Sequence, residues 1–336
     1  MTSIAVFGAG SIGCYVGGRL QAAGAAVTLI GRPRLGEVLQ SHGLTLSDYH
    51  GWEAHIPAAA LNFHQDAAAL AAADLVLVTV KSADSATAAQ TLAGALKPDA
   101  LVISLQNGLH NAEALAAHLP QHTVLAGMVP FNVAQTTPGH FHQGSEGFLA
   151  VQADARLAAF RQAFAQAGLA LEEHADMKAV QWAKLLLNLN NAVNALSGLP
   201  LKTELEQRDY RQVLAAAQKE AIALLQEKNQ PLAKLTPLPA HWIPKLLRVP
   251  DAVFRIAAKK MLAIDPLARS SMQDDLNAGR KTEIDVLQGE IMALAAAAGK
   301  SAPVNAKLLQ LVHEAESGGR RNWSGAELRR AVLNTQ

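Results

Sequence analysis

The feature that most constrains the fold is a glycine-rich turn close to the first residue. A strand-like run, Ile4 to Phe7, leads into Gly8-Ala9-Gly10-Ser11-Ile12-Gly13, and a helical stretch follows. In this context Gly8 makes the tight turn, Gly10 lets a pyrophosphate approach the backbone, and Gly13 lets helix and strand pack closely. Free N–H groups at the start of the helix attract phosphates. The turn predicts a Rossmann domain that binds a dinucleotide through Gly8, Gly10, Ser11, Ile12 and Gly13; a turn that binds nothing is the alternative.

The end of the next strand-like run indicates which dinucleotide binds. NAD enzymes usually place Asp or Glu there to meet the ribose hydroxyls, whereas this chain has Gly31-Arg32. A carboxylate would repel a 2′-phosphate and a guanidinium would pair with it, so Arg32 favours NADPH (NADP⁺) over NADH. Lys81 and Arg34 could add positive charge for the 2′-phosphate. The alternative for each is a solvated loop residue that does not contact the cofactor.

The first half of the chain alternates short apolar runs with Ala-rich helical stretches, the pattern of βαβ units around a parallel sheet. We expect buried strands at 4–7, 27–30, 75–80 and 101–105, with ligands bound at their carboxyl ends. Gly-, Pro- and β-former-rich segments at 123–133, 139–143 and 147–152 predict a meander that extends the sheet. A helix at 155–167 and a strand at 169–172 complete this domain.

The second half has an almost wholly helical pattern. We therefore place an NADP(H)-binding Rossmann domain at residues 1–176 and an all-α domain at 177–336 that contributes substrate binding and catalysis. Six prolines between residues 231 and 270 limit that segment to short helices. Its basic amphipathic pieces predict helices that pack on their own domain, with a membrane surface as the alternative.

Composition excludes other classes of protein. The 29 basic and 28 acidic residues are dispersed, so no charge pattern predicts a nucleic-acid partner or an anionic membrane surface. No apolar run approaches the roughly 20 residues needed to span a bilayer. The single cysteine, Cys14, cannot form an internal disulfide, and no spacing predicts a metal site. We expect a cytoplasmic protein with a small-molecule partner; a homodimer is left open.

A lysine and several asparagines lie within a leucine-rich helical stretch, residues 182–194. At 100° per residue Asn188 lies about 40° to one side of Lys184 and Asn191 about 20° to the other, which makes one polar stripe. Burial of this stripe would be costly unless a cleft or ligand satisfied it. Periodicity alone does not decide between such a site and a solvated surface stripe.

A second polar stretch contains Ser271 and, twelve positions later, Glu283. One unbroken helix would place them about 120° and about 18 Å apart. Gly279 and an N-cap at Thr282 predict a break, which would leave Glu283 at the exposed start of the next helix. The alternative is that Glu283 only stabilises that helix as a first-turn carboxylate.

These motifs together resemble the ketopantoate reductases (2-dehydropantoate 2-reductases) over nearly the whole chain. The order is the GxGxxG turn, Arg32, Lys81, Asn107-Gly108, W-x-K-L-x-x-N, and S-S-M-x-x-D followed by R-x-T-E-I-D. The resemblance implies NADPH-dependent reduction of ketopantoate to D-pantoate in pantothenate and coenzyme A biosynthesis. A related reductase of another branched 2-keto acid and a regulatory NADPH-binding protein without turnover are the alternatives.

The resemblance also implies roles for individual residues. Lys184 would be the general acid, and Glu283 would orient it and contact substrate and cofactor. Ser271 would hold the substrate carboxylate, and Asn188 would bind polar groups of the substrate. Asn107 would lie between nicotinamide and substrate. The chain departs from the family pattern at Ala192, for which Asn191 would substitute, and at Ala268, where an asparagine is expected.

Overall fold

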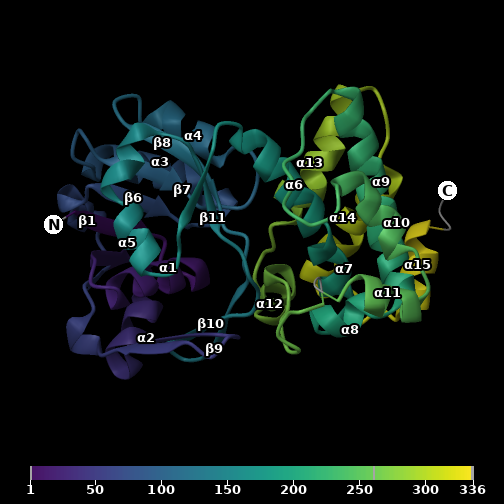
Figure 1. Cartoon of the computed structure of the whole chain (residues 1–336), viewed down its shortest axis with the longest axis horizontal. Coiled ribbons are helices and arrows are strands. Elements are labelled where there is room, and N and C mark those ends of the chain that lie inside the picture. The colour runs from purple at the N-terminus through teal and green to yellow at the C-terminus, as the bar shows by residue number, and fades with distance from the viewer. Residues whose placement is uncertain (1, 260–261, 334–336) are drawn as a thin grey trace. The chain divides into compact units, whose positions relative to one another are not determined.

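The chain consists of two compact units, Met1–Met177 and Lys178–Gln336. The computed structural model describes residues 2–259 and 262–333. Unit 1 contains a largely parallel sheet with helices, and the described part of unit 2 contains only helices and loops (Figure 1). This is the fold class that the alternating and then helical sequence pattern predicts.

The main sheet of unit 1 has eight strands in the order β12-β11-β8-β7-β6-β1-β2-β5. The six strands from β8 to β5 are parallel to one another. Strand β11 runs antiparallel to β8, and β12 runs parallel to β11. All of the carboxyl ends of the parallel strands therefore meet at one edge. The strands are β1 (Ser3–Phe7), β2 (Ala26–Ile30), β5 (Phe63–His64), β6 (Leu75–Val78), β7 (Leu101–Ser104), β8 (Thr123–Met128), β11 (Leu149–Gln152) and β12 (Leu171–His174).

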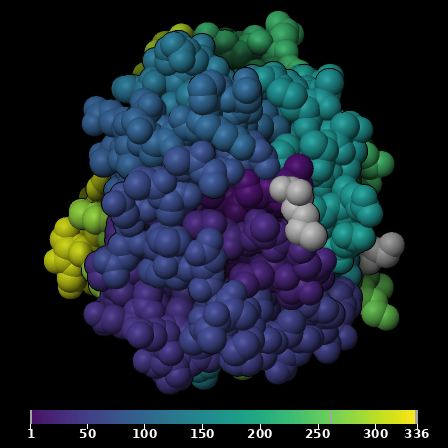
Figure 2. Space-filling view, turned by 90° about the vertical axis from the view of Figure 1, so that its left-hand side faces the viewer, coloured from purple at the N-terminus to yellow at the C-terminus, as the bar shows by residue number. Residues whose placement is uncertain are grey.

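Helices bury both faces of this sheet, which explains why its strands are continuously apolar. Successive side chains point to opposite faces, so Ile4 and Val6 pack in the core beneath α1 while Ala5 packs in the core beneath α3 and α4. Figure 2 looks onto unit 1 and shows the N-terminal residues, in purple, near the middle of that face. The covering helices are α1 (Ser11–Ala22), α2 (Pro33–His42), α3 (Ser85–Ala95), α4 (Asn111–His118) and α5 (Arg161–Gln166), with the 3₁₀ turns η1 (Ala58–Ala60), η2 (Ala67–Ala72), η3 (Ser82–Asp84) and η4 (Ala155–Ala159).

The meander extends the main sheet only in part. Strands β8 and β11 join it, but β9 (Val133–Thr137) and β10 (His140–Gln143) form a second sheet with β3 (Leu44–Asp48) and β4 (Glu53–Ile56), in the order β4-β3-β10-β9. This second sheet packs on α1. Leu44 and Leu46 of β3 contact α1 at Gly18, where a Cβ atom would approach them to 2.6–2.8 Å.

Other boundaries of unit 1 also differ from the expectations. Strand β6 ends at Val78, two residues early, and β12 begins two residues late at Leu171. The helix expected at 155–167 is divided into η4 and α5, with Phe160 buried between them. Cys14 is fully buried in α1, and burial raises the pKa of its thiol to about 12, as suits a packing residue.

Unit 2 is arranged around a long helix, α9, against which α10, α14 and α15 pack. Its residues alternate between buried and exposed with helical spacing, so α9 presents one apolar face to the core. No helix among the described residues is long and apolar enough to cross a membrane. The helices are α6 (Met177–Asn188), α7 (Asn190–Ser197), α8 (Leu201–Leu205), α9 (Arg208–Glu227), α10 (Ile243–Leu247), α11 (Asp251–Ala257), α12 (Ser271–Asn277), α13 (Ile284–Ala297), α14 (Pro303–Glu316) and α15 (Gly325–Leu333), with η5 (Ala240–Trp242).

The proline-rich segment forms short helices, as its prolines predict, and packs on its own unit. The guanidinium of Arg211, which is fully buried, donates to the carbonyl oxygens of Leu205, Leu247 and Val249 at 2.8–3.0 Å. It also lies 4.1 Å from the ring centroid of Phe254. One buried cation thus holds α10 and α11 to α9. One of the basic amphipathic pieces of this segment spans residues 254–261, and its last two residues lie outside the described residues.

Candidate functional site

The glycine turn of unit 1 is shaped by contacts that a side chain would break. Gly8 has φ +99°, and a Cβ atom there would lie 2.5–2.7 Å from Val80. At Gly13 a Cβ would lie 2.6 Å from Thr79 Oγ1 and 2.9 Å from the carbonyl oxygen of Gly8. Both glycines are therefore required by packing.

The middle glycine has a different environment, which points to a ligand. A Cβ at Gly10 would meet nothing closer than 3.9 Å. Gly10 is the N-cap of α1, yet no side chain caps this end of the helix and no acidic residue lies in its first turn. The exposed N–H groups of an uncapped helix beside an open backbone suit a phosphate. Ser11 and Ile12 are the first two residues of α1 and present these groups.

Three other predicted cofactor residues follow strands at the same edge of the sheet. Arg32 comes after β2, Lys81 after β6, and Asn107 after β7. The Arg32 side chain is 86% exposed, and its Nη2 atom lies 3.2 Å from Asp84 Oδ2. The carbonyl oxygen of Asn107 accepts a hydrogen bond from Ser82 Oγ at 2.7 Å, which ties the loops after β6 and β7 together. Unit 1 thus gathers all of its predicted residues at one edge.

Unit 2 carries Lys184 and Asn188 on α6, four residues apart on one side of the helix, and both are partly exposed. Burial lowers the pKa of the Lys184 ammonium to about 8, because a charge is poorly solvated between leucine-rich faces. The amine therefore changes its protonation state near physiological pH, as a general acid should.

The polar stripe does not continue smoothly to Asn191. Helix α6 ends at Asn188 and α7 begins at Asn190, although Leu189 keeps helical dihedral angles (φ −56°, ψ −22°). Asn191 lies on α7, is partly exposed, and accepts a weak hydrogen bond from Ser270 Oγ through its carbonyl oxygen, at 3.4 Å.

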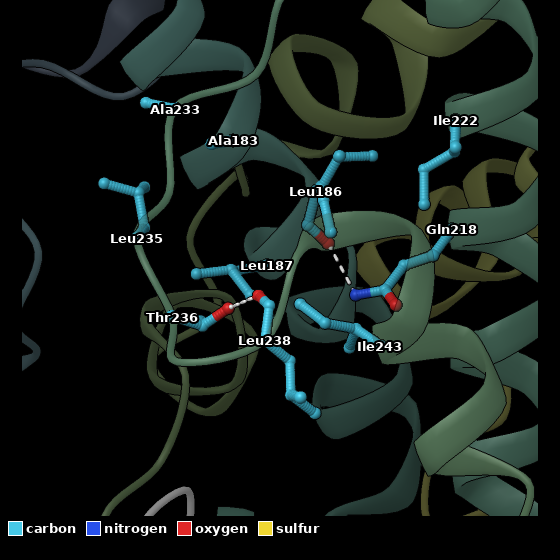
Figure 3. Close-up of a pocket in the computed structure, with 11 residues that line it drawn as sticks. Ala183, Leu186, Leu187, Gln218, Ile222, Ala233, Leu235, Thr236, Leu238 and Ile243 are labelled. Carbon is cyan, nitrogen blue, oxygen red and sulfur yellow. Dashed lines mark hydrogen bonds between the residues drawn. The ribbon is translucent and has the colours of Figure 1, made fainter.

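Two buried glutamines hold the junction between α6 and α7. Gln218 on α9 donates to the carbonyl oxygen of Leu186 at 3.0 Å, and Gln288 on α13 donates to that of Leu189 at 3.0 Å. Figure 3 shows the Gln218 side chain directed at Leu186. A helix interruption leaves carbonyl groups without intrahelical partners, and these amides satisfy two carbonyls there. The glutamines thus fix the backbone beside Asn188.

A hollow of about 310 Å³, including its opening, lies beside α6 (Figure 3). Its walls are mainly apolar side chains of α6, α9 and the segment 233–243, such as Leu187, Ile222 and Ile243. Neither Lys184 nor Asn188 lines it. The hollow therefore contributes to the apolar setting of α6 and does not hold the polar residues of the site.

Ser271 and Glu283 lie at the starts of two helices, α12 and α13, that contact the α6–α7 junction or the helix after it. Ser271 is exposed at the first position of α12, which packs on α7, and Glu283 precedes α13, whose Gln288 contacts Leu189. Gly279, with φ +64°, ends the preceding turn, and Thr282 Oγ1 accepts a hydrogen bond from the Ile284 N–H at 3.2 Å. The predicted break between the two helices is present, but the N-cap of α13 is Glu283, which is partly exposed, and not Thr282 as expected.

Sequence reasoning missed the residues that position these groups. Ser270, buried, is the N-cap of α12 and accepts from the Gln273 N–H. Glu316 accepts from the Thr282 N–H at 2.7 Å. Burial opposes its charge, but hydrogen bonds from Thr282 and Lys281 outweigh burial and lower the pKa of Glu316. Ser270 followed three residues later by Gln273 is a capping pattern that the sequence offered. Glu316 gave no such local signal.

No group of three or more His, Cys, Asp or Glu side chains within residues 2–259 and 262–333 could hold a metal ion. Unit 1 thus offers an uncapped helix start and, after β2, the exposed cation of Arg32. Unit 2 offers Lys184, whose pKa burial lowers to about 8, and Asn188 on the same side of α6.

Comparison with known proteins gives a consistent result. A family model described as ketopantoate reductase PanE/ApbA matches residues 4–155, and one described as ketopantoate reductase PanE/ApbA C terminal matches residues 176–316. The 2-dehydropantoate 2-reductase of Halobacterium salinarum is 31% identical over 327 residues, which cover 94% of this chain and 99% of the relative.

Solved structures show the same likeness. The structure of a PanE/ApbA family ketopantoate reductase from Ralstonia eutropha JMP134 superimposes with a TM-score of 0.79 at 31% identity, covering 94% of this chain and 99% of that one. A D-mandelate dehydrogenase solved with NADH and anilino(oxo)acetate has a TM-score of 0.75 at 20% identity, with coverage of 94% and 99%, which shows a shared fold.

Proposed function

The chain belongs to the ketopantoate reductase family, and from this premise we propose that it reduces 2-dehydropantoate (ketopantoate) to D-pantoate with NADPH. Family membership makes it an oxidoreductase that uses a nicotinamide cofactor. The catalytic part of the proposal rests on one observation above all, a lysine on the leucine-rich helix α6 whose ammonium has its pKa lowered to about 8 by burial. The reaction belongs to pantothenate and coenzyme A biosynthesis, and we place it in the cytoplasm.

We assign NADPH as the cofactor because of Arg32. Its guanidinium is exposed beside the end of β2, where an acidic residue would exclude a 2′-phosphate. The pyrophosphate would lie at Gly10 and the start of α1, where the backbone is open and the helix is uncapped. Lys81 and Asn107 follow strands at the same edge. The bound cofactor supplies the hydride.

The residues of unit 2 complete the reaction in this proposal. Addition of hydride to the ketone carbon leaves negative charge on the carbonyl oxygen, and the Lys184 ammonium stabilises that charge and then donates its proton. Glu283 orients the ammonium and contacts the cofactor. Asn188 and Asn191 bind polar groups of the substrate, and the Ser271 hydroxyl donates to its carboxylate.

The lowered pKa of Lys184 gives the reaction a pH dependence. The ammonium is the reactive form, and it is mostly present at neutral pH because its pKa is about 8. Reduction should therefore become slower as pH rises through about 8, when the lysine loses the proton that it must donate.

A second candidate is a reductase of another branched 2-keto acid. Ala192 and Ala268 stand where the family pattern has asparagines, and Ala192 is fully buried. Ala268 instead uses its carbonyl oxygen to accept from the Leu201 N–H at 2.9 Å. These positions can shift substrate preference without changing cofactor or proton donor.

The test is an initial-rate assay of NADPH oxidation with ketopantoate and a panel of branched and aromatic 2-keto acids. We expect ketopantoate to have the highest kcat/KM. A higher kcat/KM for another member of the panel would select the second candidate. Oxidation of NADPH with none of them would reject both and favour a regulatory NADPH-binding protein.

A further inference from the structure

A glutamate outside the proposed catalytic set is buried completely in unit 2. Glu204 lies on α8 with none of its surface exposed, and α8 packs against α7 and α9. Its Oε2 atom accepts a hydrogen bond from Asn190 Nδ2 at 2.9 Å. Asn190 is the first residue of α7 and is also buried. The contact therefore joins α8 to the junction that follows Asn188.

The second oxygen of each of these two side chains is buried and lacks a donor. Neither Glu204 Oε1 nor Asn190 Oδ1 has a hydrogen-bond partner among the described residues. Both atoms are acceptors when the carboxyl is ionised, so an ionised Glu204 would leave two buried acceptors unsatisfied. One proton on Oε1 would let it donate to Asn190 Oδ1 and complete a cyclic acid–amide pair.

Surrounding charges do not compensate an ionised Glu204. Burial raises the pKa of Glu204 to about 8, although Asn190, Asn194 and the charge of Arg211 oppose the shift. Arg211 on α9 directs its donors to three backbone carbonyls and pairs with Asp251 at 2.8 Å. The neighbouring Tyr210 stays neutral, since burial and the carboxylates around it raise the pKa of its phenol.

Helix α7 in turn holds the start of α12. Asn194, fully buried, accepts from the Ser270 N–H at 3.0 Å and donates to the Leu199 carbonyl oxygen at 2.9 Å. The Leu201 N–H, at the start of α8, donates to the Ala268 carbonyl oxygen. Residues 268–270 are thus tied to α7 and α8 immediately before Ser271.

We propose that Glu204 is a neutral carboxylic acid paired with Asn190, and that this pair is a positioning device for Ser271 and so for the carboxylate of the 2-keto acid. The pair locks α8 to the start of α7, and Asn194 and the Leu201 N–H transmit that position to the backbone that enters α12. Glu204 itself does not touch substrate. The part that concerns substrate rests on the proposed function, whereas the protonation of Glu204 does not.

The protonation state is tested without turnover, by infrared difference spectroscopy of the wild type against Glu204→Gln at neutral pH. We expect the wild type to show the C=O stretch of a protonated carboxyl group that the variant lacks. Loss of carboxylate bands alone would overturn the proposal. Glu220→Gln is the matched control, since Glu220 accepts from the N–H groups of Val304 and Asn305 through both of its oxygens and needs no proton.

The positioning role is tested by kinetics of Glu204→Gln and Glu204→Ala. A glutamine can make both hydrogen bonds to Asn190, so we expect Glu204→Gln to keep the keto-acid KM within about twofold of wild type. Glu204→Ala should raise that KM about tenfold or more, with a smaller change in kcat and an unchanged KM for NADPH. If Glu204→Ala does not fold, Asn190→Ala replaces it with the same expectation.

Two kinetic results would overturn the positioning role. One is an unchanged keto-acid KM in the alanine variants, and the other is a Glu204→Gln enzyme as impaired as Glu204→Ala. Failure of the proposed function looks different: the wild type would not turn over ketopantoate, while the infrared result would still stand or fall by itself.

Discussion

The two units present their candidate functional groups by different means. Unit 1 uses backbone: a glycine with φ +99°, an open approach at Gly10 and the uncapped start of α1, all at the carboxyl edge of a parallel sheet. Unit 2 uses side chains on α6, α7 and α12 and at the start of α13, and the buried Gln218 and Gln288 hold the junction between α6 and α7. A backbone site depends on the fold alone, whereas a side-chain site also depends on a network that substitutions can retune.

The proposed roles follow this division. The cofactor is common to many reactions, and a rigid backbone edge suits it. Proton transfer and substrate choice require particular side chains with adjusted pKa values, which helices in an apolar setting provide. Substitutions in the two units should therefore damage different kinetic constants.

The largest effect should come from Lys184→Ala. Removal of the proton donor should lower kcat by about 10² to 10⁴, while the dissociation constant of NADPH changes little. In the double variant, Glu283→Ala should lower kcat by less than it does in the wild-type background, because Lys184 and Glu283 act as a unit. Steady-state kinetics and a fluorescence titration with NADPH measure both constants. Lys307→Ala is the control for loss of a lysine elsewhere in unit 2, and a Lys184→Ala kcat within a few-fold of wild type would remove Lys184 from the mechanism.

Arg32→Ala should produce the reverse pattern. Loss of a charge-assisted contact to the 2′-phosphate should weaken NADPH binding by about 1 to 3 kcal/mol, with little change for NADH and in kcat at saturation. Titrations with both cofactors measure the difference. The exposed Arg34, two residues along, provides the control Arg34→Ala. Equal losses for NADPH and NADH would exclude a role for Arg32 in binding the 2′-phosphate.

Ser271→Ala should act on substrate binding in unit 2. The hydroxyl's hydrogen bond to the substrate carboxylate should contribute about 1.5 kcal/mol. Its loss should raise the keto-acid KM about tenfold, with a smaller change in kcat. The neighbouring Ser270→Ala should instead lower the free energy of unfolding by about 1 kcal/mol, since Ser270 caps α12. An unchanged KM in Ser271→Ala would place the carboxylate elsewhere.

The smallest effect should come from Asp84→Asn in unit 1. Asp84 pairs with Arg32 on the surface and so competes with a 2′-phosphate for the guanidinium. Because both side chains are solvated, release of Arg32 should strengthen NADPH binding by only about 0.2 to 1 kcal/mol. The gain should shrink at high salt. Weaker NADPH binding in this variant would mean that Asp84 positions Arg32 for the cofactor.

The same contrast explains how far the sequence could predict the molecule. The Rossmann unit was predictable because its turn and its apolar strands are local patterns, with a physical reason at each position. The second sheet was not, since β10 pairs with β3 across about a hundred residues of chain and no local pattern specifies that partner. Gln218 and Gln288 were not predicted for a similar reason, since the carbonyl groups that they bind lie 32 and 99 residues away along the chain.

Within the candidate site, the lysine helix and the break before Glu283 were readable from residue type and spacing. The interruption at Leu189 was not, because asparagines such as Asn188 and Asn190 occur inside helices as well as at their ends. The side chains that bind the carbonyl groups of Leu186 and Leu189 come from α9 and α13, far along the chain. Glu204 gave only the signal of a charged residue in a short polar stretch, 202–208, and its burial is a property of the packed helices.

The role of Lys184 as proton donor is tested most directly by the pH dependence of kcat/KM for ketopantoate at saturating NADPH. This constant reports the ionisation of the enzyme before the keto acid binds. We expect a plateau at neutral pH and a fall as pH rises through about 8, where the Lys184 ammonium loses its proton. A profile that stays level, or rises, well beyond pH 8 would contradict the role of this lysine.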